Sequence, residues 1–441
     1  MVSRWFAAWM TTPVRSVFPL VLGVVFVTAP LAAGPWEPLF NGRDLSGWSE
    51  VNGTAPYVVE DGAIVGSTVT GTPNSFLATD RTFGDFIFEC EVRQDVGPSN
   101  SGIMFRALST PAYQKGRVHG YQMEIDPSAR AWSGGLYDEA RRGWFYPGDL
   151  NPPAQAAYRF GEWSHLRIEA IGPSLRTWIN GTPVAHVIDG MTPAGFIALQ
   201  MHSINNPAEA GRRIAWRNLR IQTTDLRPAA PTPVVFIRNF LPNTLSEAER
   251  MQGWRALWDG VTTRGWRSAK SAEFPGEGWS TENGVLTVLD RKGGDIVTVE
   301  EFSAFELQLE FQVGEGGNSG IKYFVGPDGK GNPVGLEYQL LDDERHPDAK
   351  AGVDGNRTTA SLYDLIPRKK LPGGAAIAPK AGAWHHARLV VTPAGQVEHW
   401  INGIKALEYQ RGSPEFAAAV ARSKYKDLPG FGLEEKGPIL L

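Results

Sequence analysis

The sequence contains a single cysteine, Cys90, among its 441 residues, so an intrachain disulfide is excluded. Cys90 lies in an alternating apolar segment, on the same face as Phe86, Phe88 and Val92. This position predicts a buried structural thiol and not a nucleophile. The chain also lacks a block of basic residues, and its formal net charge is −4. Because phosphate binding requires a patch of Lys and Arg, no nucleic-acid partner is expected.

The short motifs of several enzyme classes are missing too. There is no G-x-S-x-G nucleophile elbow, no H-E-x-x-H metal motif and no C-x-x-C pair. The glycine-rich segment 326–331 lacks the Ser/Thr and the spacing of a phosphate-binding loop, and reads as a turn. The sequence also lacks long segments with the 3.6-residue hydrophobic period of a helix, which favours a fold built of strands.

Only the N-terminal segment carries a long apolar run. Arg4 and Arg15 are its only charges, residues 17–27 are apolar, and small residues follow up to Ala33. This arrangement predicts a signal peptide over residues 1–33, and therefore a periplasmic or secreted protein with no membrane span after cleavage. An uncleaved anchor is the alternative, although the run is short for a full span.

The sequence contains an internal repeat. Residues 36–48 (WEPLFNGRDLSGW) recur at 254–266 (WRALWDGVTTRGW), an offset of 254 − 36 = 218. The motifs N-S-G-I at 100, L-Y-D at 136 and W-I-N-G at 178 recur in the same order at 318, 362 and 400. This period is too long for a solenoid. We therefore expect two homologous domains, residues 34–223 and 251–441, joined by a proline-containing linker at 224–250 with a short helix capped by Thr244.

Each copy carries the signature of antiparallel strands. The chain has 50 Gly, 32 Pro and 11% aromatic residues. Residues 86–92 and 305–311 alternate with a period of two, and Asn-Gly turns follow at 180–181 and 402–403. These features predict an all-β protein made of two tandem antiparallel jelly-roll sandwiches.

The two copies end differently. Residues 437–441 (GPILL) match 195–199 (GFIAL), after which the first copy continues through His202 to a final strand at 213–221. We expect the second sandwich to lack this closing strand and the counterpart of His202, leaving an open edge. A fragmentary sequence and a non-catalytic second copy are the two explanations.

A polar stripe gives the strongest indication of a site. In residues 120–126 (GYQMEID), a strand would put Gln122, Glu124 and Asp126 on one face. The second copy repeats the pattern with acid and amide exchanged, as Glu337 and Gln339. Such a stripe either builds a site or covers a solvated sheet.

Neighbouring segments add candidates to this stripe. Alternation from Gly102 puts Arg106 on the same face, where it would bind substrate or pair with Glu124. His202 and His119 are possible bases or metal ligands. The other residues expected to contact substrate are Tyr137 and Asp138, and in the second copy Lys322, Tyr363 and Asp364.

The first copy contains six short motifs: LFNGRDLSGW at 39, NSGI at 100, GYQMEID at 120, GGLYD at 134, WING at 178 and WRNLRI at 216. In combination, these motifs resemble those of the 3-keto-disaccharide hydrolase family. The resemblance implies a concanavalin A-like lectin/glucanase sandwich and a substrate already oxidised to a ketone at C3, cleaved by hydrolysis or elimination. The family's usual Q-D-H-G is Q-M-H-S at residues 200–203. Whether a divalent metal ion binds there therefore stays open.

A C3 ketone acidifies the C2 hydrogen, so a base can form an enolate that expels the C1 substituent. We expect Glu124 or His202 as the base, and Arg106 or a divalent ion as the electrophile. The carbohydrate or oxidised glycoside would also contact Gln122 and Asp126. Two alternatives remain: a non-catalytic carbohydrate-binding tandem module, and a conventional retaining glucanase that uses Glu124 and Asp126.

Overall fold

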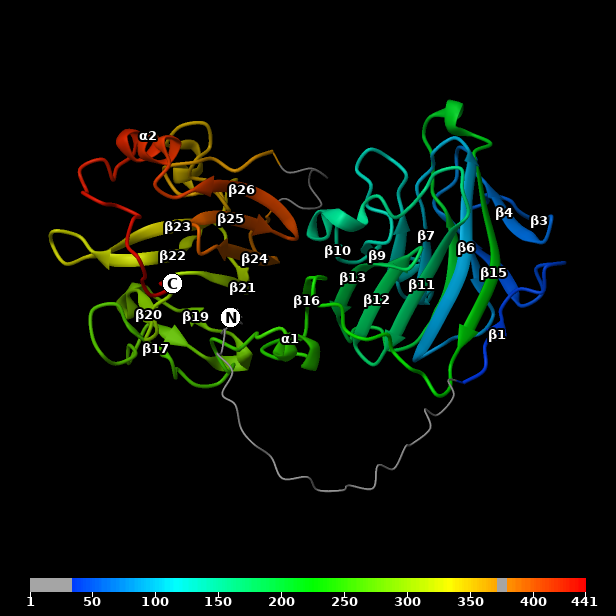
Figure 1. The fold of residues 1–441 in the computed structure, drawn as a ribbon, viewed down its shortest axis with the longest axis horizontal. Coiled ribbons are helices and arrows are strands. Elements are labelled where there is room, and N and C mark those ends of the chain that lie inside the picture. Colours follow the sequence, from blue (N-terminus) through cyan, green and yellow to red (C-terminus); the bar gives the residue numbers. More distant parts are fainter. Residues whose placement is uncertain (1–33, 371–378) are drawn as a thin grey trace, which may run out of the picture.

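The computed structural model describes residues 34–370 and 379–441, so the predicted signal peptide lies outside the described residues. Two β-rich domains lie side by side, and the first turns its edge strands β9 and β10 towards the second (Figure 1). No helix in the described part of the chain has the length and hydropathy needed to cross a bilayer.

The first domain is a sandwich of two sheets. Sheet A runs in the order β16-β13-β12-β11-β6-β15-β4-β3, with β1 pairing with β15. Its strands are β1 (Glu37–Pro38), β3 (Tyr57–Glu60), β4 (Ala63–Ser67), β6 (Phe86–Val96), β11 (Ser164–Ile171), β12 (Ser174–Ile179), β13 (Thr182–Ile188), β15 (Arg213–Gln222) and β16 (Ile237–Asn239). Sheet B runs β10-β9-β8-β7-β14-β5-β2. Its strands are β2 (Trp48–Asn52), β5 (Ser75–Thr79), β7 (Ser101–Leu108), β8 (His119–Ile125), β9 (Leu136–Glu139), β10 (Gly143–Tyr146) and β14 (Phe196–Met201).

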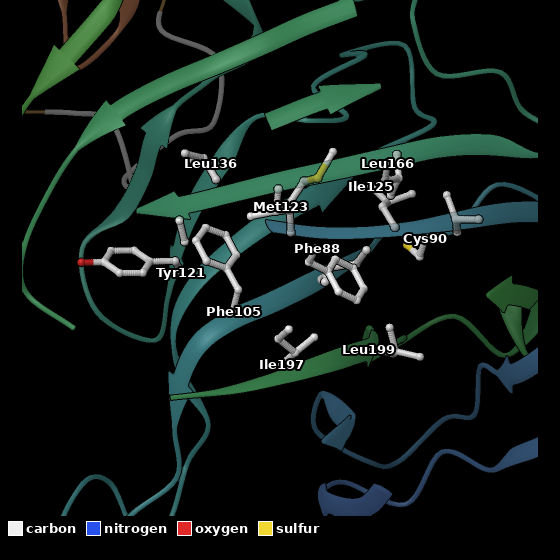
Figure 2. Packing of buried hydrophobic residues seen from close by; sticks show 14 of the residues in the cluster. Phe88, Cys90, Phe105, Tyr121, Met123, Ile125, Leu136, Leu166, Ile197 and Leu199 are labelled. Atoms are coloured by element: carbon white, nitrogen blue, oxygen red, sulfur yellow. The ribbon is translucent and has the colours of Figure 1, made fainter. Parts of the chain in front are cut away.

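Alternation along the strands decides which side chains fill the space between the sheets. Tyr121, Met123 and Ile125 of β8 point into the core with Phe88 and Cys90 of β6 (Figure 2). Burial raises the pKa of the Cys90 thiol, which fits the structural role predicted for it. Because side chains alternate across a strand, the residues between these core positions of β8 lie on the outer face of sheet B.

The linker is built into the first domain. Its strand β16 pairs in parallel with β13, with Ile237 opposite His186. The helix α1 (Glu247–Met251) follows. It begins two residues later than the predicted Thr244 cap, because Ser246 and Glu249 form a reciprocal capping box.

The second domain repeats this plan with fewer paired strands. A sheet of β21-β24-β25-β26 faces two-stranded ribbons. The elements are β17 (Trp266–Ser268), β18 (Trp279–Ser280), β19 (Thr287–Val288), β20 (Ile296–Thr298), β21 (Phe305–Gln312), β22 (Asn318–Pro327), β23 (Pro333–Leu341), β24 (Trp384–Val391), β25 (Gln396–Ile401), β26 (Ile404–Gln410) and α2 (Pro414–Arg422). Short 3-10 helices are η1 (Gly148–Leu150), η2 (Pro152–Ala154) and η3 (Pro207–Glu209) in the first domain, and η4 (Glu282–Gly284), η5 (Arg291–Gly293) and η6 (Pro347–Lys350) in the second.

The C-terminal residues confirm the alignment of the two copies. Leu440 bridges Val297 of β20 and Lys322 of β22, as β14 bridges β5 and β7 in the first domain. Within residues 34–370 and 379–441, β21 pairs with β24 alone, whereas its counterpart β6 pairs with both β11 and β15. The prediction of tandem all-β sandwiches, the second without its closing strand, is confirmed.

Each domain inserts a tryptophan into the hydrophobic cluster of the other domain. Trp132, from the β8–β9 loop, lies in the hydrophobic cluster of the second domain. Trp400, from β25, lies in the cluster of the first domain. The interface is therefore formed by core-like packing and not by surface contacts alone.

Candidate functional site

The candidate site lies on the outer face of sheet B in the first domain. Glu124 pairs with Gly102 across β8 and β7, and Gln122 pairs with Tyr137 across β8 and β9. Strand β14 is paired with β7 on the edge opposite β8. There Leu199 pairs with Ile103, so Gln200 of β14 is the neighbour of Gly102. A Cβ on Gly102 would come within 2.5 Å of the Gln122 side chain. Because Gly102 has no side chain, the Gln122 side chain can lie directly over the backbone of β7.

Glu124 is the group best suited to accept a proton. Its side chain is only 3% exposed. Asn100 donates a hydrogen bond to one carboxylate oxygen, and the Gln122 amide donates to the other at 2.9 Å. Burial raises the pKa of Glu124 to about 7, against the opposing effect of these two hydrogen bonds. A carboxylate with this pKa is a base matched to neutral pH.

The cation beside Glu124 is Arg130, which the sequence analysis missed. Its guanidinium lies 3.9 Å from the Glu124 carboxylate and donates to Asp126 at 2.7 Å. It also lies over the rings of Trp132 and Trp144, at 4.4 and 4.9 Å from their centroids. Asp126, the third polar residue of the stripe, therefore positions Arg130. The four-residue spacing from Asp126 to Arg130 was the available signal.

Arg106 is not part of this face, and the expectation that it would reach substrate or Glu124 is wrong. Its φ is +46°, and the pairing of β7 with β8 shifts after Phe105, so alternation breaks at this residue. The Arg106 guanidinium is buried and donates to the carbonyls of Gly84 and Gly172 and to Asp85. It has a structural role.

Two amides on the outer face are left with free hydrogen-bonding capacity. Both polar atoms of the Gln200 side chain and the Oε1 atom of Gln122 are buried without a hydrogen-bond partner among the residues that the structure describes. Buried polar groups are normally paired. Their position beside Gly102 and Glu124 makes them suitable for binding the hydroxyl groups of a ligand.

Tyr137 and Asp138, both expected to contact substrate, lie on opposite faces of strand β9. Tyr137 lies on the outer face, and burial together with the nearby Glu139 and Glu124 carboxylates raises its pKa. Its hydroxyl therefore stays protonated and can donate. Asp138 points to the opposite face and accepts hydrogen bonds from Arg141 and Arg142, so its predicted contact with substrate is wrong.

His202 follows β14, two residues beyond Gln200. Its Nδ1 atom lies 2.7 Å from the carbonyl oxygen of Ser203, which can only accept. Nδ1 therefore carries the proton of the neutral ring, and Nε2 is left as the basic nitrogen. His119 instead stacks on Tyr113 with ring centroids 3.9 Å apart, a packing role.

The second domain carries an altered version of the site. Gln339 pairs with Gly320, and Glu337 pairs with Lys322. A neutral amide therefore stands where the first domain has Glu124. The Gln339 amide donates to Asn318 at 3.0 Å, and its Oε1 atom is buried with no hydrogen-bond partner in the described part of the chain.

Charged groups surround Glu337 in this second face. Burial raises the pKa of Glu337, while Lys322 and Lys424 act in the opposite direction. The Tyr363 hydroxyl donates to Asp348 at 2.7 Å. Asp364 accepts from Arg357, so it is engaged in the same way as Asp138 and its predicted contact with substrate is not supported.

The residues do not fit a divalent metal centre. Within the described ranges 34–370 and 379–441, no group of three or more His, Cys, Asp or Glu side chains is arranged to hold an ion. At the expected position, Met201 belongs to the core and leaves His202 without a neighbouring carboxylate in the sequence. No chemical step is therefore assigned to a metal ion.

Comparisons with known proteins agree with the repeat. The family described as the 3-keto-alpha-glucoside-1,2-lyase-like domain matches residues 35–222 and 253–441. A protein of Bacteroides thetaiotaomicron named 3-keto-disaccharide hydrolase is 35% identical over 192 residues, which is 39% of this chain and 64% of the relative's length. A candidate glycosyl hydrolase from Parabacteroides distasonis is 29% identical, with a TM-score of 0.40 over 45% of this chain and 90% of that one. A carbohydrate-binding module from Bacillus subtilis is 19% identical, with a TM-score of 0.27 over 40% of this chain and 95% of the module.

Proposed function

Because both halves of the chain belong to the 3-keto-alpha-glucoside-1,2-lyase-like domain family, we propose that the protein is an exported enzyme that cleaves 3-keto-glycosides. The family and the name of the curated relative support a carbohydrate-active enzyme of the hydrolase type. The finer assignment concerns the reaction and the domain that performs it. We assign the chemistry to the first domain.

The observation that carries this proposal is the environment of Glu124. A buried carboxylate with a pKa of about 7, next to an arginine 3.9 Å away, is a base placed beside a cation. Removal of a proton next to a ketone needs both groups: one takes the proton, and the other stabilises the negative charge that develops on the oxygen.

The steps follow from the ketone. The Glu124 carboxylate takes the C2 proton, and the C–H electron pair forms the C2=C3 bond of an enolate whose oxygen is stabilised by Arg130. As the C3 carbonyl forms again, a C1=C2 bond is made and the C1–O bond breaks. The leaving group departs with a proton, which Glu124 or water supplies. Addition of water across C1=C2 then gives the free 3-keto sugar, so elimination followed by hydration equals hydrolysis.

Other residues on the face position the sugar. The protonated Tyr137 hydroxyl can donate to the developing oxyanion, because its raised pKa keeps it neutral. Among the described residues, the Oε1 atom of Gln122 and both polar atoms of the Gln200 side chain have no hydrogen-bond partner and are available to the sugar. His202, with Nε2 as its basic nitrogen, is the second candidate base for activating the water.

One assay tests this function directly. The purified protein is incubated with methyl 3-keto-α-glucoside with and without a chelator, and release of methanol is measured. We expect turnover that resists the chelator and falls by about 10²-fold or more in Glu124→Gln. Sugar binding without turnover would instead favour the carbohydrate-binding module. Turnover that the chelator abolishes would replace Arg130 with a metal ion as the electrophile.

The retaining glucanase is disfavoured by the state of its second carboxylate. Asp126 accepts from the Ser128 amide with one oxygen and from Arg130 with the other. Both oxygens are thus engaged within the protein, and Asp126 serves as the partner of Arg130. Cleavage of an unoxidised glucan by the purified protein would nevertheless overturn the preference.

A further inference from the structure

A large cavity lies where the two domains meet. Its volume is about 1090 Å³, and its walls come from β9–β10 of the first domain, from the linker, and from β21 and β24 of the second. Pockets for small molecules usually measure about 300–1,000 Å³. The cavity is therefore large enough for several sugar rings, and neither domain forms it alone.

The cavity reaches strand β9, which is paired with the strand that carries the proposed catalytic base. Tyr137 and Trp144 both line it. Tyr137 is the strand neighbour of Gln122, and its pKa is influenced by Glu124. The Arg130 guanidinium that reaches Glu124 also covers the Trp144 ring. A ligand bound at Glu124 can therefore extend over these two rings into the cavity without leaving the surface of the protein.

The walls are held in place by contacts between the domains. Trp132 and Trp400 are each buried in the cluster of the other domain. Arg238 of the linker donates to the Phe145 carbonyl of β10 at 2.5 Å. The cavity is thus framed by well-packed elements and does not depend on a single loose contact.

The lining combines aromatic faces with polar side chains. Trp144, Phe240 and Trp384 supply rings, while Gln308, Asn243 and Arg142 supply donors and acceptors. A sugar ring presents C–H groups on its faces and hydroxyls at its edge, so it matches aromatic faces beside amides and charged groups.

From this continuity we infer that the cavity binds further sugar units of the leaving group, so that the second domain selects oligosaccharide substrates. This inference rests on the proposed function for the identity of the reacting ring. In this arrangement the first domain performs the chemistry, and the second domain, with Gln339 in place of a base, supplies the distal wall.

The test compares substrates of two lengths in the full-length protein. Methyl 3-keto-α-glucoside is the short substrate, and a 3-keto-glucoside whose leaving group is a glucose disaccharide is the long one. Trp384 lies on β24 and is 51% exposed, so Trp384→Ala should fold normally. We expect its KM for the long substrate to rise roughly tenfold, with kcat and all constants for the short substrate nearly unchanged.

Phe160 provides the matched control. It is an aromatic residue of similar exposure, 46%, and does not line the cavity. Phe160→Ala should leave both substrates unaffected. Equal effects of Trp384→Ala on the short and long substrates, or no preference of the wild-type protein for the long one, would overturn the inference.

A binding measurement separates this inference from the proposed function. Maltotriose and methyl α-glucoside, the unoxidised probes, are titrated calorimetrically into the wild-type protein and Trp384→Ala. Tighter binding of maltotriose that is weakened in Trp384→Ala supports the cavity assignment even if no 3-keto-glycoside is turned over. Turnover of 3-keto-glycosides with no dependence on chain length in either experiment leaves the proposed function standing and removes the cavity from it.

Discussion

Gln339 pairs with Gly320 in the second domain as Glu124 pairs with Gly102 in the first. The two side chains occupy equivalent positions in the two copies of the sheet. Each is hydrogen-bonded to the asparagine of its N-S-G-I motif. One is an acid and the other an amide, so only the first can take a proton near neutral pH. The duplicated fold therefore carries two sites of unequal chemistry.

The pH dependence of turnover should reflect Glu124. Because burial raises its pKa to about 7, the carboxylate form that acts as base is lost as the pH falls below that value. We expect kcat/KM on methyl 3-keto-α-glucoside to rise with pH up to a plateau above about 8. A profile that stays flat between pH 5 and 8 would exclude Glu124 as the base.

The same group should influence stability with a defined sign. The folded pKa of Glu124, about 7, exceeds its ordinary value of 4.5, so the native state holds a proton that the unfolded chain releases. The free energy of unfolding therefore decreases as the pH rises from about 4.5 to 7, by up to about 3 kcal/mol. Glu124→Gln lacks this decrease, and its Tm should exceed that of the wild type at pH 8 but not at pH 4.5. Glu50→Gln, an exposed change on β2, should show no such difference.

Removal of Arg130 should affect catalysis more than folding. Arg130→Met removes the charge beside Glu124, so turnover should fall by about 10–10³-fold, and loss of the ion pair with Asp126 should lower Tm only moderately because Arg130 is partly exposed. Because Arg130 lowers the pKa of Glu124, the acid limb of the rate profile should also move to higher pH. A variant that loses activity without this movement would indicate a contact with substrate only.

Arg106→Met should have the opposite pattern. It leaves the carbonyls of Gly84, Gly172 and Ala170 without their buried donor, and we expect a loss of about 3 kcal/mol in urea unfolding. The folded fraction should keep its turnover. The exposed Arg43→Ala is the control, with no expected change in stability. Normal stability combined with lost activity would return Arg106 to the site.

The sequence was sufficient for the architecture because the evidence for it is periodic. Alternation in residues 120–126 placed Gln122 and Glu124 on one face, and the 218-residue offset reappears in hydrogen bonds, since Trp48 donates to Leu39 as Trp266 donates to Leu257. Periodicity failed where the backbone departs from a regular strand. The positive φ of Arg106 reversed its side chain.

Residues in loops could not be placed by any period. Arg130 comes from the loop after β8, and its contact with Glu124 depends on the path of that loop and on the two tryptophans beneath its guanidinium. Asp138 and Asp364 were expected to contact substrate because they follow loops. Asp138, however, lies in a strand beside the outward Tyr137 and therefore points inward, and Asp364 lies in a turn with a φ of +59°.

The reciprocal burial of Trp132 and Trp400 has a consequence for how the protein melts. When one domain unfolds, it withdraws a tryptophan from the core of the other and leaves a cavity there, which destabilises the remaining domain. We therefore expect the two domains to unfold as one cooperative unit. Calorimetry of the whole protein should therefore record a single heat-absorption peak, with an enthalpy that belongs to both sandwiches together.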